Sequence, residues 1–401
     1  MNNSFSIDKV LAQLFLLFAF IFPLSVFAGN FIAFIIIILW LLSDNLKEKI
    51  LLIRKDKLFR AVSLFFLLHV FGLLWTEDIT WGLEMIRKML DLGILFPILL
   101  TLVDRNKIRL YIYIFLSSIT LIVILSFMIW FGFLEPFKNA TALNPTPLMT
   151  HITHGPFIAF ASYLIGSLYL NTEKKFFSVN KIVLALLFLF FSINVFITGG
   201  RTGQVVYLFL FSLMYFQNFN INIKSFFKVF SVLTAILFIA FNTSQIFQNR
   251  IIETYEDFQK FEQEKNTNLG LRIQFAINSI EIFKNNPIIG VGTGDFPIEF
   301  AKINKVNSPE IEHGKITTNP HNNYLLLMSQ FGIAGLISLF YIFFRQFKSL
   351  DKNSTLIKNI GLGFIIFFSV ICFGDSYLLG HFTSFMFVFF SSFLYSQDEQ
   401  T

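Results

Sequence analysis

The sequence predicts an all-α polytopic membrane protein, with about twelve transmembrane helices and one large helical loop outside the membrane. Of the 401 residues, 55% are apolar and only 14% are charged, whereas soluble domains have about 25% charged residues. Apolar segments recur at roughly 17–25 residues, the length with which a helix crosses a bilayer. Basic residues gather in alternate connections, which is typical of membrane proteins with a fixed orientation.

The twelve predicted transmembrane segments follow one another along the chain with one long interruption. They are residues 9–27, 30–45, 58–75, 88–103, 108–134, 151–170, 182–199, 202–217, 226–242, 322–344, 356–374 and 377–395. The first could instead be a signal peptide, because SVFAGN resembles a cleavage site. Its start holds Asp8 beside Lys9 and eleven apolar segments follow, so we expect a retained helix.

The basic residues predict the orientation of these segments. Nineteen of the 31 Lys and Arg residues lie in one set of connections, which includes both termini, and four lie in the short connections on the other side. The positive-inside rule places the richer set in the cytoplasm. The remaining eight lie in residues 243–321, which are therefore predicted to be outside. This gives three parts: a bundle in 1–242, a loop domain in 243–321 and C-terminal helices in 322–401.

The long loop is predicted to contain two helices. QIFQNRIIETYEDFQKFEQEK has apolar residues at spacings of three and four, which is typical of an amphipathic helix on the membrane surface or packed on the bundle. These residues are Phe247, Ile251, Tyr255, Phe258 and Phe261. NLGLRIQFAINSIEIFKNN predicts a second helix that begins near 268–270 and ends at 285–286, before a proline.

PIIGVGTGDF follows, with glycines at 290, 292 and 294. Its spacing is not that of a dinucleotide-binding loop. We expect a tight turn. The alternative is a nest of backbone N–H groups, including that of Gly292, which would bind an anion.

Arg201 lies in FITGGRTGQVV, a tight connection between two predicted helices. Gly199 and Gly200 are expected to let the backbone bend sharply there. The turn brings a guanidinium group and the N–H groups of the next helix together, and both attract anions. Gly200 and Thr202 are therefore substrate-binding candidates beside Arg201. The alternative is an interfacial arginine that reaches lipid phosphates.

Arg272 lies at the start of the second loop helix, in LGLRIQF. A cation is unfavourable at a helix N-terminus unless an anion lies nearby. The sequence therefore suggests an anionic ligand, and the alternative is an exposed arginine that pairs with Glu264 or faces solvent.

His321 lies in TTNPHNNYLLLMSQFGIAGL, where a polar segment turns into an apolar helix. Pro320 ends the preceding segment, and Asn322 or Asn323 can cap the helix without any histidine. An imidazole there can exchange a proton near neutral pH. The alternative is an interfacial aromatic residue with a polar tip.

Other candidates have weaker support. Arg87 could bind substrate or pair with Asp91 four residues on. His151 and His154 are expected to be interfacial, and Asp375 and His381 structural. The single cysteine, Cys372, excludes an intramolecular disulfide and a multi-cysteine metal site.

These motifs resemble the O-antigen ligase family of bacterial membrane glycosyltransferases and the related polysaccharide polymerases. TGGRTG follows a mid-chain helix, an arginine lies in GLRIQFAINSIEIFKNNPIIGVGTGDF, and NPHNNYLLLMSQFGIAGLISLF leads into the next helix. The patterns N-P-x-x-G-x-G and H-N-x-x-L-x6-G-x-x-G-L carry the resemblance, which is best from about 185 to 345.

The resemblance implies a GT-C-like enzyme of the bacterial inner membrane, with its active site facing the periplasm. Such an enzyme moves a glycan from undecaprenyl pyrophosphate to a hydroxyl of the lipid A-core, in lipopolysaccharide biosynthesis of the cell envelope. It inverts the anomeric carbon and uses no metal or other cofactor. By position, Arg201, Arg272 and His321 match the family's functional residues. Asn319 and Asn322, next to His321, are candidate substrate contacts.

Three alternatives remain open at this point. A polymerase would extend the glycan on its own carrier, and a protein O-oligosaccharyltransferase would use a protein hydroxyl. A lipid-glycan transporter or flippase is the alternative from another class. Transporters often show internal repeats and charges near the membrane midplane, whereas this sequence shows no convincing repeat and its strongest charges lie at the predicted outer ends of the helices. We expect lipids as partners and no nucleic acid.

Overall fold

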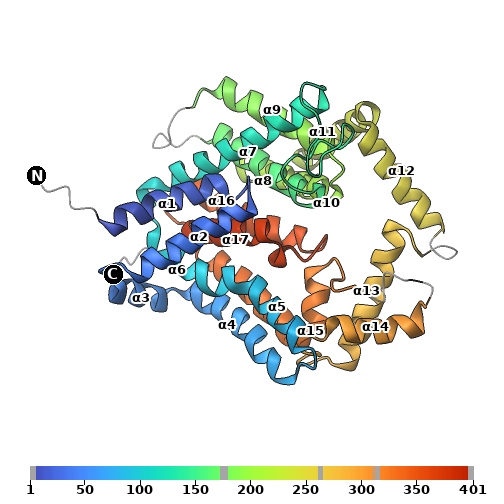
Figure 1. Ribbon diagram of the computed structural model, residues 1–401. Coiled ribbons are helices and arrows are strands. Elements are labelled where there is room, and N and C mark those ends of the chain that lie inside the picture. Colours follow the sequence, from blue (N-terminus) through green and yellow to red (C-terminus); the bar gives the residue numbers. More distant parts are fainter. Residues whose placement is uncertain (1–5, 172–178, 261–264, 310, 312–316, 396–401) are drawn as a thin grey trace, which may run out of the picture. The chain divides into compact units, whose positions relative to one another are not determined.

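The computed structural model describes residues 6–171, 179–260, 265–309, 311 and 317–395, and every regular element among them is a helix (Figure 1). The α-helices are α1 (Ile7–Ile21), α2 (Val26–Leu41), α3 (Leu46–Lys55), α4 (Lys57–Phe71), α5 (Ile79–Leu90), α6 (Phe96–Leu102), α7 (Ile108–Trp130), α8 (His151–Leu170), α9 (Lys181–Phe196), α10 (Arg201–Asn218), α11 (Ile223–Thr243), α12 (Gln245–Lys260), α13 (Asn268–Asn285), α14 (Phe296–Asn307), α15 (Asn323–Lys348), α16 (Thr355–Ile371) and α17 (His381–Leu394). The all-helical fold class is confirmed, and each of the twelve predicted apolar segments contains an α-helix.

Within the described residues, four helices are long and apolar enough to cross a membrane, or up to five if one bent pair counts as a single span. They cover Lys57–Trp75, Arg105–Trp130, Ile223–Thr243 and Asn323–Lys348. Three shorter apolar helices are α9, α16 and α17. These lengths support a membrane protein, while twelve spans and their orientation stay predictions.

Some elements do not follow the hydropathy pattern. α3 is a basic helix inside a predicted connection, and α14 is a helix in the loop that begins with a proline in its first turn. The predicted segment 88–103 is helical up to residue 102 but contains the π-helical turn Asp91–Leu95 between α5 and α6. Hydropathy alone reports none of these, since α3 and α14 are polar and a π turn leaves the composition unchanged.

The helices form two compact units, each built from separate stretches of the chain. Among the described residues, unit 1 takes those of 1–46, 102–251 and 350–371. Unit 2 takes those of 47–101, 252–349 and 372–401. The predicted loop domain, 243–321, is thus divided between them after residue 251.

Unit 1 is centred on α8, whose residues 154–167 are all buried. Its neighbour α10 approaches closely, because glycines face each other across the contact. A Cβ atom on Gly203 would lie 2.4 Å from the carbonyl carbon of Gly155, so no larger residue fits at Gly203 unless the helices move apart. This packing fixes the start of α10, where Arg201 lies.

Unit 2 has its apolar core under the second loop helix. Met85, Phe275, Ile282, Phe296, Phe300 and Leu326 form one buried cluster, drawn from α5, α13, α14 and α15. The cluster therefore attaches the loop helices to the start of α15.

The two glycine motifs of the sequence meet at a kink in α15. Gly332 has a left-handed backbone (φ 59°, ψ −144°), and the N–H of Ile333 donates to the carbonyl of Pro287 at 2.8 Å. A Cβ atom on Gly332 would lie 2.5 Å from that carbonyl oxygen. Glycine is required there for both reasons, which explains why N-P-x-x-G-x-G and G-x-x-G-L occur in one chain.

The first loop helix, α12, is amphipathic as predicted but only its first turns are packed. Phe247 is buried, with its ring centroid 5.6 Å from that of Phe196. Ile251, Tyr255 and Phe258 are 48%, 63% and 70% exposed, and Phe261 lies outside the described residues. The prediction that this apolar face lies on a membrane surface therefore remains open to test.

Candidate functional site

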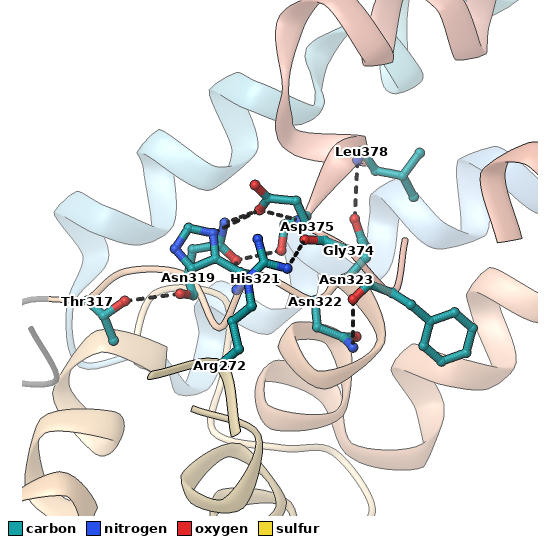
Figure 2. Close-up of polar contacts among 11 residues, drawn as sticks. Arg272, Thr317, Asn319, His321, Asn322, Asn323, Gly374, Asp375 and Leu378 are labelled. Atoms are coloured by element: carbon teal, nitrogen blue, oxygen red, sulfur yellow. Dashed lines mark hydrogen bonds and ion pairs between the residues drawn. The ribbon is translucent and has the colours of Figure 1, made fainter. Parts of the chain in front are cut away.

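α13 brings two side chains to the site from one face of the helix. Arg272 and Phe275 are three residues apart, which places them on the same side. The exposed guanidinium of Arg272 donates from Nη1 to the carbonyl oxygen of Gly374 at 2.9 Å (Figure 2). The ring of Phe275 is buried and lies at 14° to the imidazole of His321, with 6.2 Å between centroids. The loop helix therefore supplies both a cation and a support for the histidine.

His321 has an unusual backbone conformation, with φ of +54°. Few residues other than glycine adopt this region, although Asn, Asp and His do so more readily than most. The conformation is held by a hydrogen bond from the His321 N–H to Oδ1 of Asn319 at 2.9 Å. A non-glycine residue kept in this region often belongs to a functional site.

The imidazole of His321 faces a carboxylate. Its Nδ1 lies 3.3 Å from Oδ1 of Asp375, and the same oxygen accepts a hydrogen bond from Nδ2 of Asn319 at 2.9 Å (Figure 2). The His321 side chain is 41% exposed and that of Asp375 17%. Because an ionised carboxylate only accepts hydrogen bonds, Nδ1 of the neutral imidazole carries the proton and Nε2 keeps its lone pair.

Asp375 is held in its ionised form. Burial acts to raise the pKa of its carboxyl group, but the hydrogen bond and charge of His321, together with hydrogen bonds from Ser376 and Asn319, outweigh this. The pKa of Asp375 therefore lies below its ordinary value, and the group is a carboxylate at neutral pH.

The segment that carries Asp375 is fastened to the start of α15. The Asn323 N–H donates to the carbonyl of Cys372 at 2.8 Å, and the Leu378 N–H donates to Oδ1 of Asn323 at 3.2 Å. Ser376 Oγ donates to Oδ1 of Asn319 at 2.6 Å. The carboxylate and the histidine are therefore placed by one hydrogen-bonded framework.

Asn322 is the N-cap of α15, as the sequence allowed. Its Oδ1 accepts the N–H groups of Tyr324 at 2.9 Å and Leu325 at 3.1 Å. Capping explains the residue by itself, so substrate binding by Asn322 stays a prediction.

In unit 1, Arg201 is the first residue of α10 and Thr202 the second. The predicted combination of a guanidinium group with a helix N-terminus is therefore present. The turn before it is anchored by Asn144, whose Oδ1 accepts the Gly199 N–H at 2.9 Å.

The reason for glycine in this turn differs from the prediction. Gly200 has φ −83°, which any residue can adopt, so it does not supply a special bend. A Cβ atom there would instead lie 2.4 Å from the carbonyl oxygen of His151. Close packing against α8 explains Gly200 without any role in binding substrate.

The predicted site residues are thus divided between the two units. Arg272, Asn319, His321 and Asn322 come together in unit 2, and Arg201, Gly200 and Thr202 share one turn in unit 1. Glu264, the suggested partner of Arg272, lies outside the described residues.

Arg87 does not pair with Asp91 as suggested. Its guanidinium makes two hydrogen bonds to Glu84, from Nε at 2.7 Å and Nη2 at 2.6 Å. The hydrogen bond and charge of Arg87 hold the pKa of Glu84 below its ordinary value. An exposed pair on one helix explains Arg87 by itself, so substrate binding by Arg87 stays a prediction.

Gly292 belongs to the tight turn that was expected. It has φ +104°, and its N–H donates to the carbonyl of Gln330 at 2.9 Å. The N–H of Val291 likewise donates to Ser329 at 3.0 Å. These N–H groups are used inside unit 2, which favours the turn over the anion nest.

His154 is not interfacial, contrary to the prediction. It is fully buried, with Nε2 2.8 Å from Oδ1 of Asn194. This hydrogen bond satisfies one ring nitrogen inside unit 1, whereas Nδ1 is buried without a hydrogen-bond partner among the described residues. No group of three or more His, Cys, Asp or Glu side chains is placed to hold a metal among the residues described. Metal independence stays a prediction.

Asp375 and Phe275 are contacts of His321 that the sequence did not predict. Asp375 was expected to be structural, although an ionisable residue next to an apolar helix is a functional candidate by default. Phe275 gives no signal, because it looks like any core residue of an amphipathic helix.

Comparison with known proteins gives one family match. Residues 184–340 match the model of a family described as O-Antigen ligase. The match runs from α9 into α15 and includes Arg201, Arg272 and His321, whereas Asp375 lies outside it. The search of the curated proteins finds no match for the chain. The family match supports a membrane glycosyltransferase of the O-antigen ligase or polymerase type, and over residues 184–340 this chain is similar to the O-antigen ligase family.

Proposed function

We propose that this protein moves a glycan from undecaprenyl pyrophosphate to an acceptor hydroxyl, with the lipid A-core as acceptor. In the proposed reaction the hydroxyl oxygen attacks the anomeric carbon and the bond to the diphosphate breaks, so the carbon is inverted. The hydroxyl proton goes to the enzyme, and the diphosphate leaves with the electron pair of the broken bond. The reaction uses no nucleotide sugar and no metal.

His321 is the proposed general base. The observation that supports this most is the contact of its Nδ1 with the Asp375 carboxylate, which leaves Nε2 to accept a proton. The sequence left open whether His321 is a base or only a hydrogen-bond donor. The carboxylate partner favours the base, because it orients the ring and stabilises the imidazolium that forms.

Arg272 is proposed to bind the leaving diphosphate. It is exposed and next to the His321–Asp375 pair, and one of its five N–H groups donates to Gly374. Guanidinium groups suit phosphate oxygens because they can donate two parallel hydrogen bonds. Arg201 of unit 1 is proposed, as the sequence predicted, to bind phosphate as well, because it lies at a helix N-terminus.

The proposed setting is the bacterial inner membrane, with both termini in the cytoplasm and the site facing the periplasm. Both substrates are then anchored in the membrane, and the site lies where an apolar helix begins, at residues 319–323. This agrees with the charge distribution of the connections.

The test uses the purified full-length protein in lipid nanodiscs with an undecaprenyl pyrophosphate-linked glycan and lipid A-core. We expect transfer without nucleotide, ATP or an ion gradient, unaffected by a chelator, and lost in His321→Ala. Glycan that lengthens on its own carrier would identify a polymerase instead. Dependence on a proton or sodium gradient would favour a transporter, and loss of activity with chelator would end the metal-free mechanism.

A further inference from the structure

Unit 1 contains an apolar pocket of about 380 Å³ between α9, α10 and α11. Aromatic side chains form the wall on the α9 and α10 side, namely Phe188, Phe196, Tyr207 and Phe211. Ile236 and Ala240 of α11 close the other side. α11 is one of the helices that could cross a membrane, so the pocket lies among apolar helices of a membrane protein.

The pocket offers a ligand almost only hydrocarbon. Each hydroxyl group of its wall already donates within the protein: Tyr207 to Ser192 Oγ, Ser192 to the Phe188 carbonyl, Thr243 to the Ile239 carbonyl and Ser244 to the Phe196 carbonyl. A sugar would lose its hydrogen bonds to water on entry without replacing them. A lipid chain would lose none.

Beyond one end of the pocket, the turn before α10 lies close to an arginine that the proposed mechanism does not use. Ile197 and Ser244 belong to the pocket wall, and Gly199 follows Ile197 by two residues. A Cβ atom on Gly199 would have Nε of Arg250 at 3.5 Å and Nδ2 of Asn144 at 3.6 Å. Arg250 follows Ser244 by six residues, or roughly 9 Å of helix.

The pocket therefore joins an apolar interior to a cationic end. α10 and the turn before it connect the two, because α10 supplies Tyr207 and Phe211 to the wall and begins with Arg201. This is the arrangement that an anionic lipid requires, with its chain in the pocket and its phosphate beside the arginines.

We propose that this pocket holds the first isoprene units of the donor's polyprenyl chain, and that Arg250 binds the donor's diphosphate together with Arg201. The proposal rests on the proposed function, which supplies a polyprenyl diphosphate. The volume suits one chain: at ~30 Å³ for each water-sized group it takes about a dozen carbon atoms. Two acyl chains of a phospholipid need more space side by side.

The experiment measures binding to the full-length protein, without glycan or acceptor. Undecaprenyl diphosphate is the probe, and its affinity is measured by native mass spectrometry from detergent micelles. Ala240→Phe fills the pocket from α11, and Ala235→Phe is the matched control on the exposed side of the same helix. Arg250→Gln removes the cation, and Lys260→Gln is the control at the exposed end of α12.

We expect Ala240→Phe and Arg250→Gln each to weaken binding at least about tenfold. The first fills the space for the chain, and the second removes the hydrogen bonds of a charged group to the diphosphate. The two controls should bind as the unmodified protein does. Thermal unfolding of each variant identifies a misfolded protein, and Ala240→Leu then serves as the smaller filling substitution.

Two results would overturn the proposal. One is unchanged binding in folded Ala240→Phe or Ala240→Leu and in Arg250→Gln. The other is displacement of the probe by an equal amount of phosphatidylglycerol, which would show a general lipid slot. A third result would contradict the proposed function alone. In that case the carrier would bind in a way that depends on Ala240 and Arg250, but the protein would transfer no glycan.

Discussion

Nδ1 of His321 lies 3.3 Å from Oδ1 of Asp375, although 54 residues separate them in the chain. The pair is fixed from both sides, because Asn319 accepts the His321 N–H and donates to the same carboxylate oxygen. The arrangement selects the tautomer with its lone pair on Nε2, which is the form a general base needs.

Asp375→Asn should lower the rate of transfer by about 10²–10⁴-fold, the contribution that general-base catalysis usually makes. Asparagine can donate to Nδ1 and thereby move the imidazole proton to Nε2, where it blocks the base. The rate constant at saturating substrate is the measurement, and carrier binding should change little. Asp375→Glu, which keeps the charge, should recover part of the rate. Equal transfer rates in Asp375→Asn and Asp375→Glu would show that the carboxylate has no role in the mechanism.

His321→Gln separates the two roles that the sequence left open. Glutamine can donate a hydrogen bond but cannot take a proton near neutral pH, so we expect it to be as inactive as His321→Ala. The comparison needs both variants in the same transfer assay. Substantial activity in His321→Gln alone would assign hydrogen bonding to the residue and leave the base unidentified.

Arg272→Lys should be nearly as inactive as Arg272→Gln, because an ammonium group cannot donate the two parallel hydrogen bonds of a guanidinium group. Lys284→Gln is the matched control, since Lys284 is exposed in the last turn of the same helix. Transfer rates should fall in the first two variants and stay unchanged in the third. A fully active lysine variant would mean that charge alone is sufficient at this position.

The pH dependence of stability follows from the lowered pKa of Asp375. A depressed carboxyl pKa stabilises the folded state at every pH above the pKa of the unfolded chain, about 3.9, and this contribution disappears as the pH falls through the lower folded value. Unfolding in detergent should therefore show a constant excess stability over Asp375→Asn from neutral pH down to about pH 5, and a shrinking excess below about pH 4. An excess that grows on acidification would contradict the sign of this pKa shift.

Gly200→Ala should destabilise the protein by about 1–3 kcal/mol, the usual cost of overpacking. Its Cβ atom would collide with the carbonyl oxygen of His151, and that atom belongs to the backbone. Thr202→Ala removes a side chain two residues away and should change unfolding by much less. Similar unfolding temperatures for both variants would mean that α8 and α10 separate easily.

Sequence patterns predicted the apolar helices and part of the site, but not α3, α14 or the π-helical turn Asp91–Leu95. Periodicity and capping placed α13 and the start of α15 correctly, because these ends are local features such as Asn286 and Asn322. α15 itself runs to Lys348, four residues beyond the predicted end. The contact of His321 with Asp375 depends on the folding of a distant turn onto α15, which no local pattern reports. Gly200 shows the same limit, since a glycine needed for close packing looks in the sequence like one needed for a bend.

The left-handed backbone of His321 restricts which amino acids a mutational library can place there. Most L-residues lose roughly 1–2 kcal/mol in that conformation, and valine or isoleucine are genuine outliers in it. A residue at position 321 must therefore meet two requirements. Its backbone must adopt the left-handed conformation, and its side chain must be able to act as the base. Glycine adopts the left-handed conformation more easily than alanine but has no imidazole. His321→Gly should therefore give a stable, inactive enzyme that can trap bound substrates.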